Sequence, residues 1–245
     1  MINLVIDIGN SRTKIALFNQ HDLMFNLSID HLTVDHLKML KDEHPQLNKA
    51  ILSTVKPDDS ELNQFLSGNF DFFTELDHHT KLPIENLYET PETLGKDRLA
   101  AAVGANELFP DQNLLVIDAG TAITYDLVSE KNQFLGGNIS PGLEMRFKAL
   151  NQFTGRLPLI SYSDEFQPIG KNTTEAIRAG VQNGILYEIA QTIDLFNRNY
   201  QNLQIIMTGG DSIFFDKKLN YSIFVNFNLT LIGLNRILEH NAKEK

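Results

Sequence analysis

The sequence predicts an α/β fold built from two similar halves, and three observations lead to this prediction. A strand–turn–strand pattern runs from Leu4 to Phe18 and recurs from Leu115 to Val128. The two copies are offset by 111 residues and keep Leu, Val, Ile, Asp, Gly and Thr in register. In both halves, amphipathic helical segments alternate with further short apolar runs. Two matching turns therefore predict two matching half-structures.

The composition limits the kind of protein this can be. The chain has 245 residues, of which 42% are apolar, so it can bury the core of one large domain or two modest ones. Its net charge of −10 and scattered Lys and Arg residues argue against a non-specific nucleic-acid binder, which needs a basic stripe. The absence of cysteine excludes a disulfide scaffold, a zinc–thiolate site and thiol catalysis, and fits a reducing cytoplasm.

The apolar N-terminus does not have the pattern of a signal peptide. Asp7 interrupts the run within a few residues, no basic region precedes it and no small-residue cleavage site follows. No other apolar run approaches the roughly 18 residues that a membrane-spanning helix requires. We therefore expect a soluble cytoplasmic protein without a membrane partner.

The two repeated turns are the first candidate sites. In the first copy an apolar strand ends at Asp7 and is followed by Gly9 and short polar residues. In the second copy Asp118, Gly120 and Thr121 occupy the matching positions. Each turn would present backbone N–H groups and hydroxyls beside one carboxylate, a combination suited to phosphate and metal.

The rest of the first half predicts the order β-β-β-α-β-α. The first helix, over Thr33 to Glu43, is expected to bury Leu37 and Leu40. The segment from Asp77 to Pro91 is polar and irregular, and ordered loops of this length are often functional. The further expected elements are a strand over Asp22 to Leu27, a helix over Thr33 to Glu43, a strand over Lys49 to Thr54, an amphipathic segment over Asp59 to Phe65 and a strand over Phe70 to Thr74.

An alanine-rich helix is expected to begin after Leu94 and to end before Pro110. Asp97 lies at its start, where two interpretations are open. Asp97 is either an N-cap that satisfies free N–H groups, with Arg98 an ordinary surface cation, or a functional carboxylate. The position of Gly95 directly after a long loop favours the second interpretation.

In the second half, a returning strand enters a glycine cluster over Gly136 to Gly142, which indicates tight turns or close backbone approach. Gly180 and Gly184 lie beside the apolar stripe of a long helix and allow another helix to approach, from the same chain or from a second subunit. The expected elements are helices over Leu143 to Leu150, from Asn172 to beyond Phe196, and over Leu229 to His240, with a strand over Gln204 to Met207 leading into a third glycine turn at Thr208 to Ser212.

These elements fit the duplicated actin-like ATPase fold, which is ribonuclease H-like, with two β-β-β-α-β-α halves around a nucleotide cleft. We expect residues 1–113 to form the N-terminal half, with the first phosphate turn and the substrate segment. Residues 114–245 would form the C-terminal half, with the second phosphate turn and an adenosine turn.

Six short motifs make a more specific resemblance. From residue 1 to about residue 237 the chain resembles the type III pantothenate kinase family. The motifs are Asp7-Ile8-Gly9-Asn10-Ser11, Leu94-Gly95-Lys96-Asp97-Arg98, Asp118-Ala119-Gly120-Thr121-Ala122, Gly136-Gly137-Asn138-Ile139-Ser140-Pro141-Gly142, Ile169-Gly170-Lys171-Asn172-Thr173 and Thr208-Gly209-Gly210-Asp211.

The resemblance implies ATP-dependent phosphorylation of pantothenate to 4′-phosphopantothenate, the first step of coenzyme A biosynthesis. It implies that Asp97 is the general base, that Asp118 binds a monovalent cation, K⁺ or NH₄⁺, and that Asp7 lies near the Mg²⁺-bound phosphates. The implied substrate contacts are Tyr88, Gly95, Lys96, Asp97, Arg98 and Thr173. The implied ATP contacts are Asp7, Ile8, Gly9, Asn10, Ser11, Arg12, Thr13, Lys14 and Thr121.

The family also implies a homodimer with the substrate site near the subunit interface. Ser11 stands where the family usually has Thr, which keeps the hydroxyl, and Lys96 stands where a small or neutral residue is more usual. Two alternatives stay open: a non-catalytic, nucleotide-sensing regulator of the same fold, and another kinase or phosphatase of the superfamily that acts on a sugar or on polyphosphate. The presence of Asp7, Asp97, Arg98 and Asp118 favours the pantothenate kinase.

Overall fold

The computed structural model describes residues 2–10, 12–55 and 60–243. The chain forms two compact units, which are described separately. The first unit comprises Met1–Pro110, Asn132–Phe134 and Asn228–Lys245, and the second comprises Asp111–Lys131 and Leu135–Phe227. The expected division after residue 113 lies close to the change of unit at Pro110, but the C-terminal helix groups with the first unit.

The first unit contains a five-stranded sheet with the order β3-β2-β1-β4-β5. β1, β2 and β3 are antiparallel neighbours, whereas β4 and β5 run parallel to β1. The strands are β1 (Ile2–Ile8), β2 (Thr13–Asn19), β3 (Asp22–Ile29), β4 (Leu47–Thr54) and β5 (Phe72–Glu75).

The second sheet repeats this order as β9-β8-β7-β10-β11, so the duplication predicted from the two turns is confirmed. The short β6 (Glu85–Asn86), inside the segment expected to be irregular, pairs with the first residues of β9. The other strands are β7 (Leu114–Ala119), β8 (Ala122–Ser129), β9 (Gln133–Pro141), β10 (Gln204–Thr208) and β11 (Ile223–Val225).

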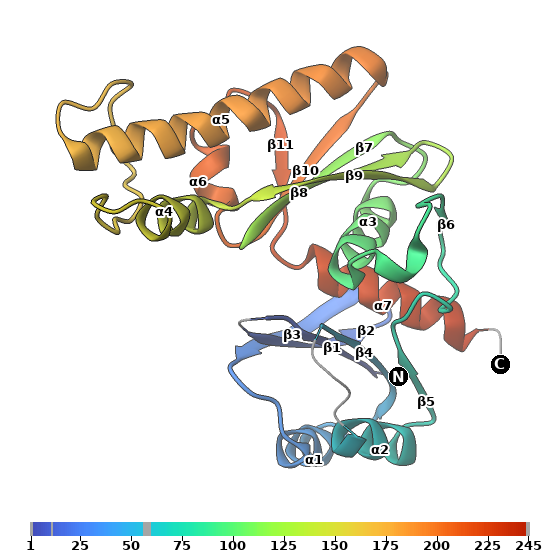
Figure 1. Cartoon of the computed structure of the whole chain (residues 1–245). Coiled ribbons are helices and arrows are strands. Elements are labelled where there is room, and N and C mark those ends of the chain that lie inside the picture. Colours follow the sequence, from blue (N-terminus) through green and yellow to red (C-terminus); the bar gives the residue numbers. More distant parts are fainter. Residues whose placement is uncertain (1, 11, 56–59, 244–245) are drawn as a thin grey trace. The chain divides into compact units, whose positions relative to one another are not determined.

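In the first unit, α1 and α2 cover one face of the sheet and α7 lies on the other face (Figure 1). Leu37 of α1 is fully buried in the core, whereas Leu40 is only half-buried at its edge. The predicted helix start at Thr33 forms a capping box with His36. The helices are α1 (Val34–Glu43), α2 (Ser60–Asn69), the 3₁₀ turn η1 (Pro91–Thr93), α3 (Lys96–Leu108) and α7 (Leu229–Ala242). Asp59, expected to start the segment that became α2, lies outside the described residues.

Two glycines let α3 and α7 touch backbone to backbone. A Cβ atom on Gly104 would lie 2.1 Å from the carbonyl oxygen of Leu229, and one on Gly233 would lie 1.8 Å from that of Ala100. Real Cβ atoms do not approach an oxygen so closely. A residue larger than glycine at either position would therefore force α3 and α7 apart. This close crossing fixes where α3 lies.

Buried amides fix the position of α7 against the first sheet. The Asn3 side chain donates to Asn235 Oδ1 at 2.8 Å, and Asn235 Nδ2 donates to the carbonyl oxygen of Gln20 at 2.8 Å. Asn3 and Asn235 are only 3% exposed, so the loss of either partner would leave an unsatisfied polar group in the core.

In the second unit, α4 (Leu143–Gln152), α5 (Thr173–Asn199) and α6 (Ser212–Asp216) lie on one face of the sheet (Figure 1). The predicted α5 start is confirmed, because Asn172 Oδ1 accepts the Glu175 backbone N–H at 3.0 Å. The predicted apolar stripe of α5 is buried in the core, with Phe196 partly buried at its edge; the buried members are Ile177, Val181, Ile185, Ile189 and Ile193. The predicted contact of another helix at Gly180 and Gly184 is absent within the described part of this chain, since no atom beyond the helix's own neighbouring backbone lies within 4 Å of an added Cβ.

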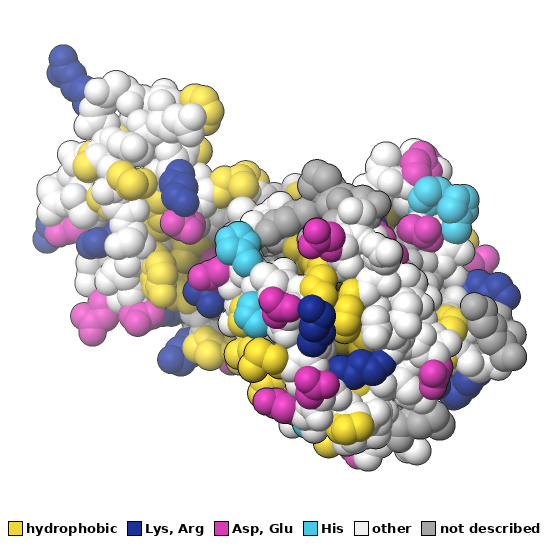
Figure 2. Space-filling model, turned by 90° about the horizontal axis from the view of Figure 1, so that it is seen from below, with side chains coloured by type: hydrophobic (Ala, Val, Ile, Leu, Met, Phe, Trp, Pro, Cys, Tyr) yellow, Lys and Arg dark blue, Asp and Glu magenta, His cyan; other side chains and the backbone are white. Residues whose placement is uncertain are grey.

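On the face shown in Figure 2, Lys and Arg side chains alternate with acidic, apolar and uncharged ones, and no continuous basic stripe is visible among the described residues. None of the helices in the described ranges has the length and apolar content needed to cross a membrane.

Candidate active site

The first turn connects β1 and β2 in the first unit. Ile8 and Thr13 are the last paired residues, and the Gly9 N–H donates to the carbonyl oxygen of Arg12 at 3.0 Å. Thr13 is buried, whereas Asn10 and Arg12 are exposed. Ser11, a predicted ATP contact, lies outside the described residues. Because the Gly9 N–H closes the hairpin, Asn10 and Arg12 are the described members of this turn that are open to a ligand.

Asp7 lies at the end of β1, half-buried and directly opposite Lys14 of β2. Burial raises the pKa of Asp7 from 3.8 to about 6, in spite of the nearby Lys14 charge, and the negative charge of Asp97 raises it further; a hydrogen bond with Ser53 acts in the opposite direction. The structure therefore brings Asp7 and Asp97, which are ninety positions apart in the sequence, within electrostatic range of each other.

Asp97 is the exposed second residue of α3, and Gly95 is the N-cap. The interpretation of Asp97 as the N-cap is therefore wrong, although its Oδ1 does accept the backbone N–H of Arg98 at 2.8 Å. A Cβ on Gly95 would lie 2.6 Å from Asp97 Oδ1, so the glycine makes room for this carboxylate. The N–H groups of the first helical turn favour a negative charge at this position.

Arg98 is 6% exposed, so the interpretation of this residue as a surface cation is also wrong. Its Cζ lies 5.6 Å from the ring centroid of Tyr88, within cation–π range. Tyr88 in turn packs near Phe134, at 6.2 Å between ring centroids, and its N–H donates to Asn86 Oδ1 at 3.1 Å. The long loop that the sequence marked as functional thus places Tyr88 against Arg98.

Lys96 does not point freely outward. Its Nζ lies 3.3 Å from Glu75 Oε1 at the end of β5, and Asn63 donates to the other oxygen of Glu75 at 3.2 Å. This partly buried pair ties the start of α3 to the sheet.

The second turn, between β7 and β8, has only two residues, Gly120 and Thr121. The Gly120 N–H donates to the carbonyl oxygen of Ala122 at 3.1 Å, and Thr121 is exposed. The repeated motifs therefore differ in geometry, because the first turn is longer than the second.

The third turn packs against Asp118 at the end of β7. Gly209 has a φ of 93°, and a Cβ there would lie 2.5 Å from Asp118 Oδ1 and 2.4 Å from the carbonyl oxygen of Ala119. The Asp211 N–H donates to that same carbonyl oxygen at 3.0 Å. Glycine is required at this position for two reasons. It adopts a positive φ readily, and it has no side chain that would displace the Asp118 carboxylate.

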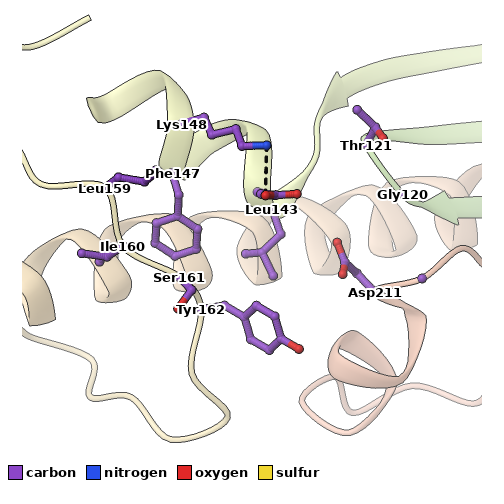
Figure 3. Close-up of a pocket in the computed structure, with 12 residues that line it drawn as sticks. Gly120, Thr121, Leu143, Phe147, Lys148, Leu159, Ile160, Ser161, Tyr162 and Asp211 are labelled. Atoms are coloured by element: carbon purple, nitrogen blue, oxygen red, sulfur yellow. Dashed lines mark ion pairs between the residues drawn. The ribbon is translucent and has the colours of Figure 1, made fainter. Parts of the chain in front are cut away.

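A cavity of about 620 Å³ opens beside the second and third turns within the second unit. Thr121 and Asp211 lie at one end of it, and the apolar side chains of Phe147 and Ile160 lie at the other (Figure 3). Burial raises the pKa of Asp211, and the charge of Glu144 raises it further. The lining residues are Gly120, Thr121, Leu143, Glu144, Phe147, Lys148, Leu159, Ile160, Ser161, Tyr162, Gly210 and Asp211.

Sequence reasoning missed the contribution of residues 159–162 to this cavity, because they lie in an irregular stretch without periodicity. The third glycine turn, which contains Asp211, was predicted to lie by the adenosine, but no site role was assigned to Asp211 itself. Thr173 is the exposed first residue of α5 and is not among the residues that line the cavity.

Among the described residues, no group of three or more His, Asp or Glu side chains is arranged to hold a metal ion. Mg²⁺ in phosphoryl-transfer enzymes is usually held by one or two carboxylates together with the substrate phosphates. Asp7 is a single carboxylate and fits that mode of binding. Burial disfavours its charged form, and a bound cation would favour it.

The repeated sheet, with a turn suited to phosphate in each copy, defines a protein of the actin-like ATPase and sugar-kinase fold class. The chain aligns over its whole length with the inorganic polyphosphate/ATP-glucomannokinase of Arthrobacter sp. strain KM, with a TM-score of 0.51, 11% identity and 99% of that chain covered. It also aligns with a Campylobacter jejuni protein assigned to the Baf family of transcriptional activators, with a TM-score of 0.62, 24% identity, and 98% and 99% of the two chains covered. These similarities concern the fold.

Sequence comparison is more specific. The type III pantothenate kinase family model matches residues 3–195. The type III pantothenate kinase of Bacteroides fragilis (strain YCH46) is 46% identical over 244 residues, which cover 98% of each chain. That of Phocaeicola vulgatus is 45% identical over 242 residues, which cover 99% of this chain and all of the relative. The chain belongs to the type III pantothenate kinase family.

Proposed function

We propose that this protein transfers the γ-phosphate of ATP to pantothenate, giving 4′-phosphopantothenate and ADP, the first step of coenzyme A biosynthesis. The observation that carries the proposal is the exposed Asp97 carboxylate at the start of α3. It lies close enough to Asp7 to raise the pKa of that group, and it is flanked by the buried Arg98 with Tyr88 beside it. A protein that only binds nucleotide has no need of such a carboxylate.

In this assignment Asp97 accepts the proton of the primary hydroxyl of pantothenate while that oxygen forms its bond to the γ-phosphorus and the bond to ADP breaks. Arg98 binds the pantothenate carboxylate, for which its rigid planar donors are suited. Gly95, Lys96, Tyr88 and Thr173 complete the proposed substrate contacts. Positioning of this kind can lower a barrier by roughly 7–11 kcal/mol.

We assign ATP binding to both repeated turns. In the first, residues 7–14 carry Asp7, the proposed carboxylate for Mg²⁺, and Lys14 opposite it. In the second, Thr121 is the proposed ATP contact. A bound Mg²⁺ would neutralise charge on the transferring phosphoryl group, and its positive charge would also offset the disfavoured ionisation of Asp7.

Asp118 is the proposed ligand of a monovalent cation, K⁺ or NH₄⁺. Such ions prefer carbonyl and carboxylate oxygens, and Asp118 Oδ1 lies close to Gly209 beside the Ala119 carbonyl group. We further propose a cytoplasmic homodimer. The exposed side chains of Tyr187 and Leu195 on α5, 65% and 55% exposed, support a subunit contact along this helix.

The test is a coupled ADP-release assay with ATP, Mg²⁺ and pantothenate, run in K⁺ and in Na⁺, on the wild type and on Asp97→Asn. We expect pantothenate-dependent turnover of the wild type, higher in K⁺, and a loss of kcat of roughly 10²- to 10⁴-fold in the variant. No pantothenate-dependent turnover in any condition would overturn the kinase assignment. A fully active Asp97→Asn enzyme would overturn only the assignment of the base.

The same assay separates the alternatives. A nucleotide-sensing regulator would bind ATP without pantothenate-dependent turnover. A sugar or polyphosphate kinase would turn over with glucose, or with polyphosphate as donor, rather than with pantothenate.

A further inference from the structure

The Gly120–Thr121 turn is held in place by the end of β9. The Gly142 N–H donates to the carbonyl oxygen of Thr121 at 3.0 Å. A Cβ on Gly142 would lie 2.2 Å from the carbonyl oxygen of Gly120 and 2.4 Å from that of Thr121. Because the two backbones are in direct contact, a displacement of residues 140–142 would displace the turn.

Arg146, one turn into α4, holds residues 140–142 from the other side. Its Nε donates to the carbonyl oxygen of Pro141 at 2.8 Å, and its Nη2 donates to Ser140 Oγ at 2.9 Å. The Arg146 side chain is 22% exposed, so its contacts are only weakly screened by solvent. Both donors act on the segment that touches the turn.

Glu188 of α5 anchors the guanidinium group. One of its oxygens lies 2.6 Å from Arg146 Nη2, and the other accepts the Tyr125 hydroxyl hydrogen bond at 2.8 Å. Tyr125 belongs to β8, the strand that leaves the Gly120–Thr121 turn. The contacts therefore form a closed ring that begins and ends at the turn.

At neutral pH the Glu188 carboxyl group is ionised and the Tyr125 hydroxyl group is protonated. Burial by itself would raise the pKa of Glu188, but hydrogen bonds from Arg146, Tyr125 and Ser140 outweigh it, and the pKa is lowered. Burial and the bond to Glu188 raise the pKa of the Tyr125 hydroxyl, which stays protonated and donates. An ionised acceptor between two donors gives short, strong hydrogen bonds.

We propose that Arg146 is a positioning residue for phosphoryl transfer, which fixes the Gly120–Thr121 turn in the conformation that binds the phosphates of ATP. The inference rests on the proposed function. The Nε and Nη2 donors of Arg146 already serve Pro141, Ser140 and Glu188, so its effect on ATP passes through the backbone of the turn. None of these contacts involves a residue proposed to bind pantothenate: most of those residues lie in the first unit, and Thr173 lies fifteen residues before Glu188 on α5.

The test compares Arg146→Gln, Arg146→Lys and Glu188→Gln in steady-state assays with each substrate varied in turn. We expect Arg146→Gln to lower kcat/KM for ATP by roughly 10- to 100-fold, since a small misplacement of binding groups has effects of this size. The KM for pantothenate should change less than about twofold if the effect is confined to the turn. Arg146→Lys, which keeps the ion pair with Glu188, should recover part of the loss, and Glu188→Gln should show the same selective defect more weakly.

The matched control is Arg156→Gln, which removes an exposed arginine of the same unit that lies outside α5, and it should leave all constants unchanged. A fall in the affinity for pantothenate as large as that for ATP, in a variant that a parallel thermal melt shows to be folded, would overturn the proposal. If Arg146→Gln does not fold, Arg146→Lys and Glu188→Gln decide by the same criterion. If the wild type shows no turnover at all, ATP binding measured by calorimetry still tests the turn: equal affinity of wild type and variants would refute it.

Discussion

Asp7→Asn should make the protein more stable at neutral pH. A rise in the pKa from 3.8 to about 6 means that the folded protein holds this proton more tightly than the unfolded chain does. The folded state is therefore penalised progressively as pH rises through this window, and fully above it. At about 1.4 kcal/mol per pH unit, the penalty reaches at most about 3 kcal/mol. Asparagine keeps the shape of the side chain and carries no charge, so it removes the penalty.

The measurement is urea unfolding without nucleotide or metal at two pH values. We expect Asp7→Asn to raise the free energy of unfolding by about 1–3 kcal/mol at pH 7.5 and by about half as much at pH 5. The exposed Asp22→Asn is the matched control in the same sheet, and a change below about 0.5 kcal/mol is expected for it. A gain that does not depend on pH, or no gain at pH 7.5, would refute the reasoning.

A double-mutant cycle tests the contribution of Asp97 to this penalty. Because the Asp97 charge raises the pKa of Asp7, removing it with Asp97→Asn should reduce the penalty that Asp7 carries at pH 7.5. The gain from Asp7→Asn should therefore be smaller in the Asp97→Asn background than in the wild type. Strict additivity would mean that the two carboxylates do not interact in the folded protein.

The remaining predictions concern packing and binding. Gly233→Ala should lower the free energy of unfolding, measured in urea, by at least about 1–3 kcal/mol, because the added Cβ would lie 1.8 Å from a carbonyl oxygen of α3. Gly180→Ala, which has open space around it, should raise the free energy of unfolding in the same measurement by up to about 1 kcal/mol. Arg98→Lys should raise the KM for pantothenate about tenfold, because it loses the planar donors, and Tyr88→Phe, which keeps the ring face, should have a smaller effect in the same assay. Asp118→Asn should abolish the difference in rate between K⁺ and Na⁺ buffers, and an unchanged ratio would exclude Asp118 as the cation ligand.

The duplicated sheet could be predicted from the sequence because its signals are local. The runs that end at Asp7 and Asp118 are apolar, are followed by a glycine and resemble each other, and the stripe of α5 repeats with helical spacing. The residues around Asp97 were harder to interpret, since a carboxylate at a helix start is explained equally well by capping. Only the structure shows that Gly95 occupies the N-cap and that Arg98 is buried.

Contacts between distant segments could not be predicted. Gly104 and Gly233 are single glycines in ordinary helical stretches, and nothing local to either marks it as the partner of the other. Gly180 and Gly184 have the spacing that suggests close helix packing, yet the described part of the chain places no atom against them. The Arg146–Glu188 pair is likewise formed between two helices whose facing sides depend on the fold of the whole second unit.

The position of α7 has a consequence for how the protein is made. The first unit holds Asp7 and Asp97, but α7, which backs α3 and carries Asn235, follows the whole second unit in the sequence. N-terminal domains usually fold first during synthesis. Here the ribosome must complete the entire second unit before the first can close its core, and the helix that carries Asp97 is among the last parts of the molecule to gain its final support.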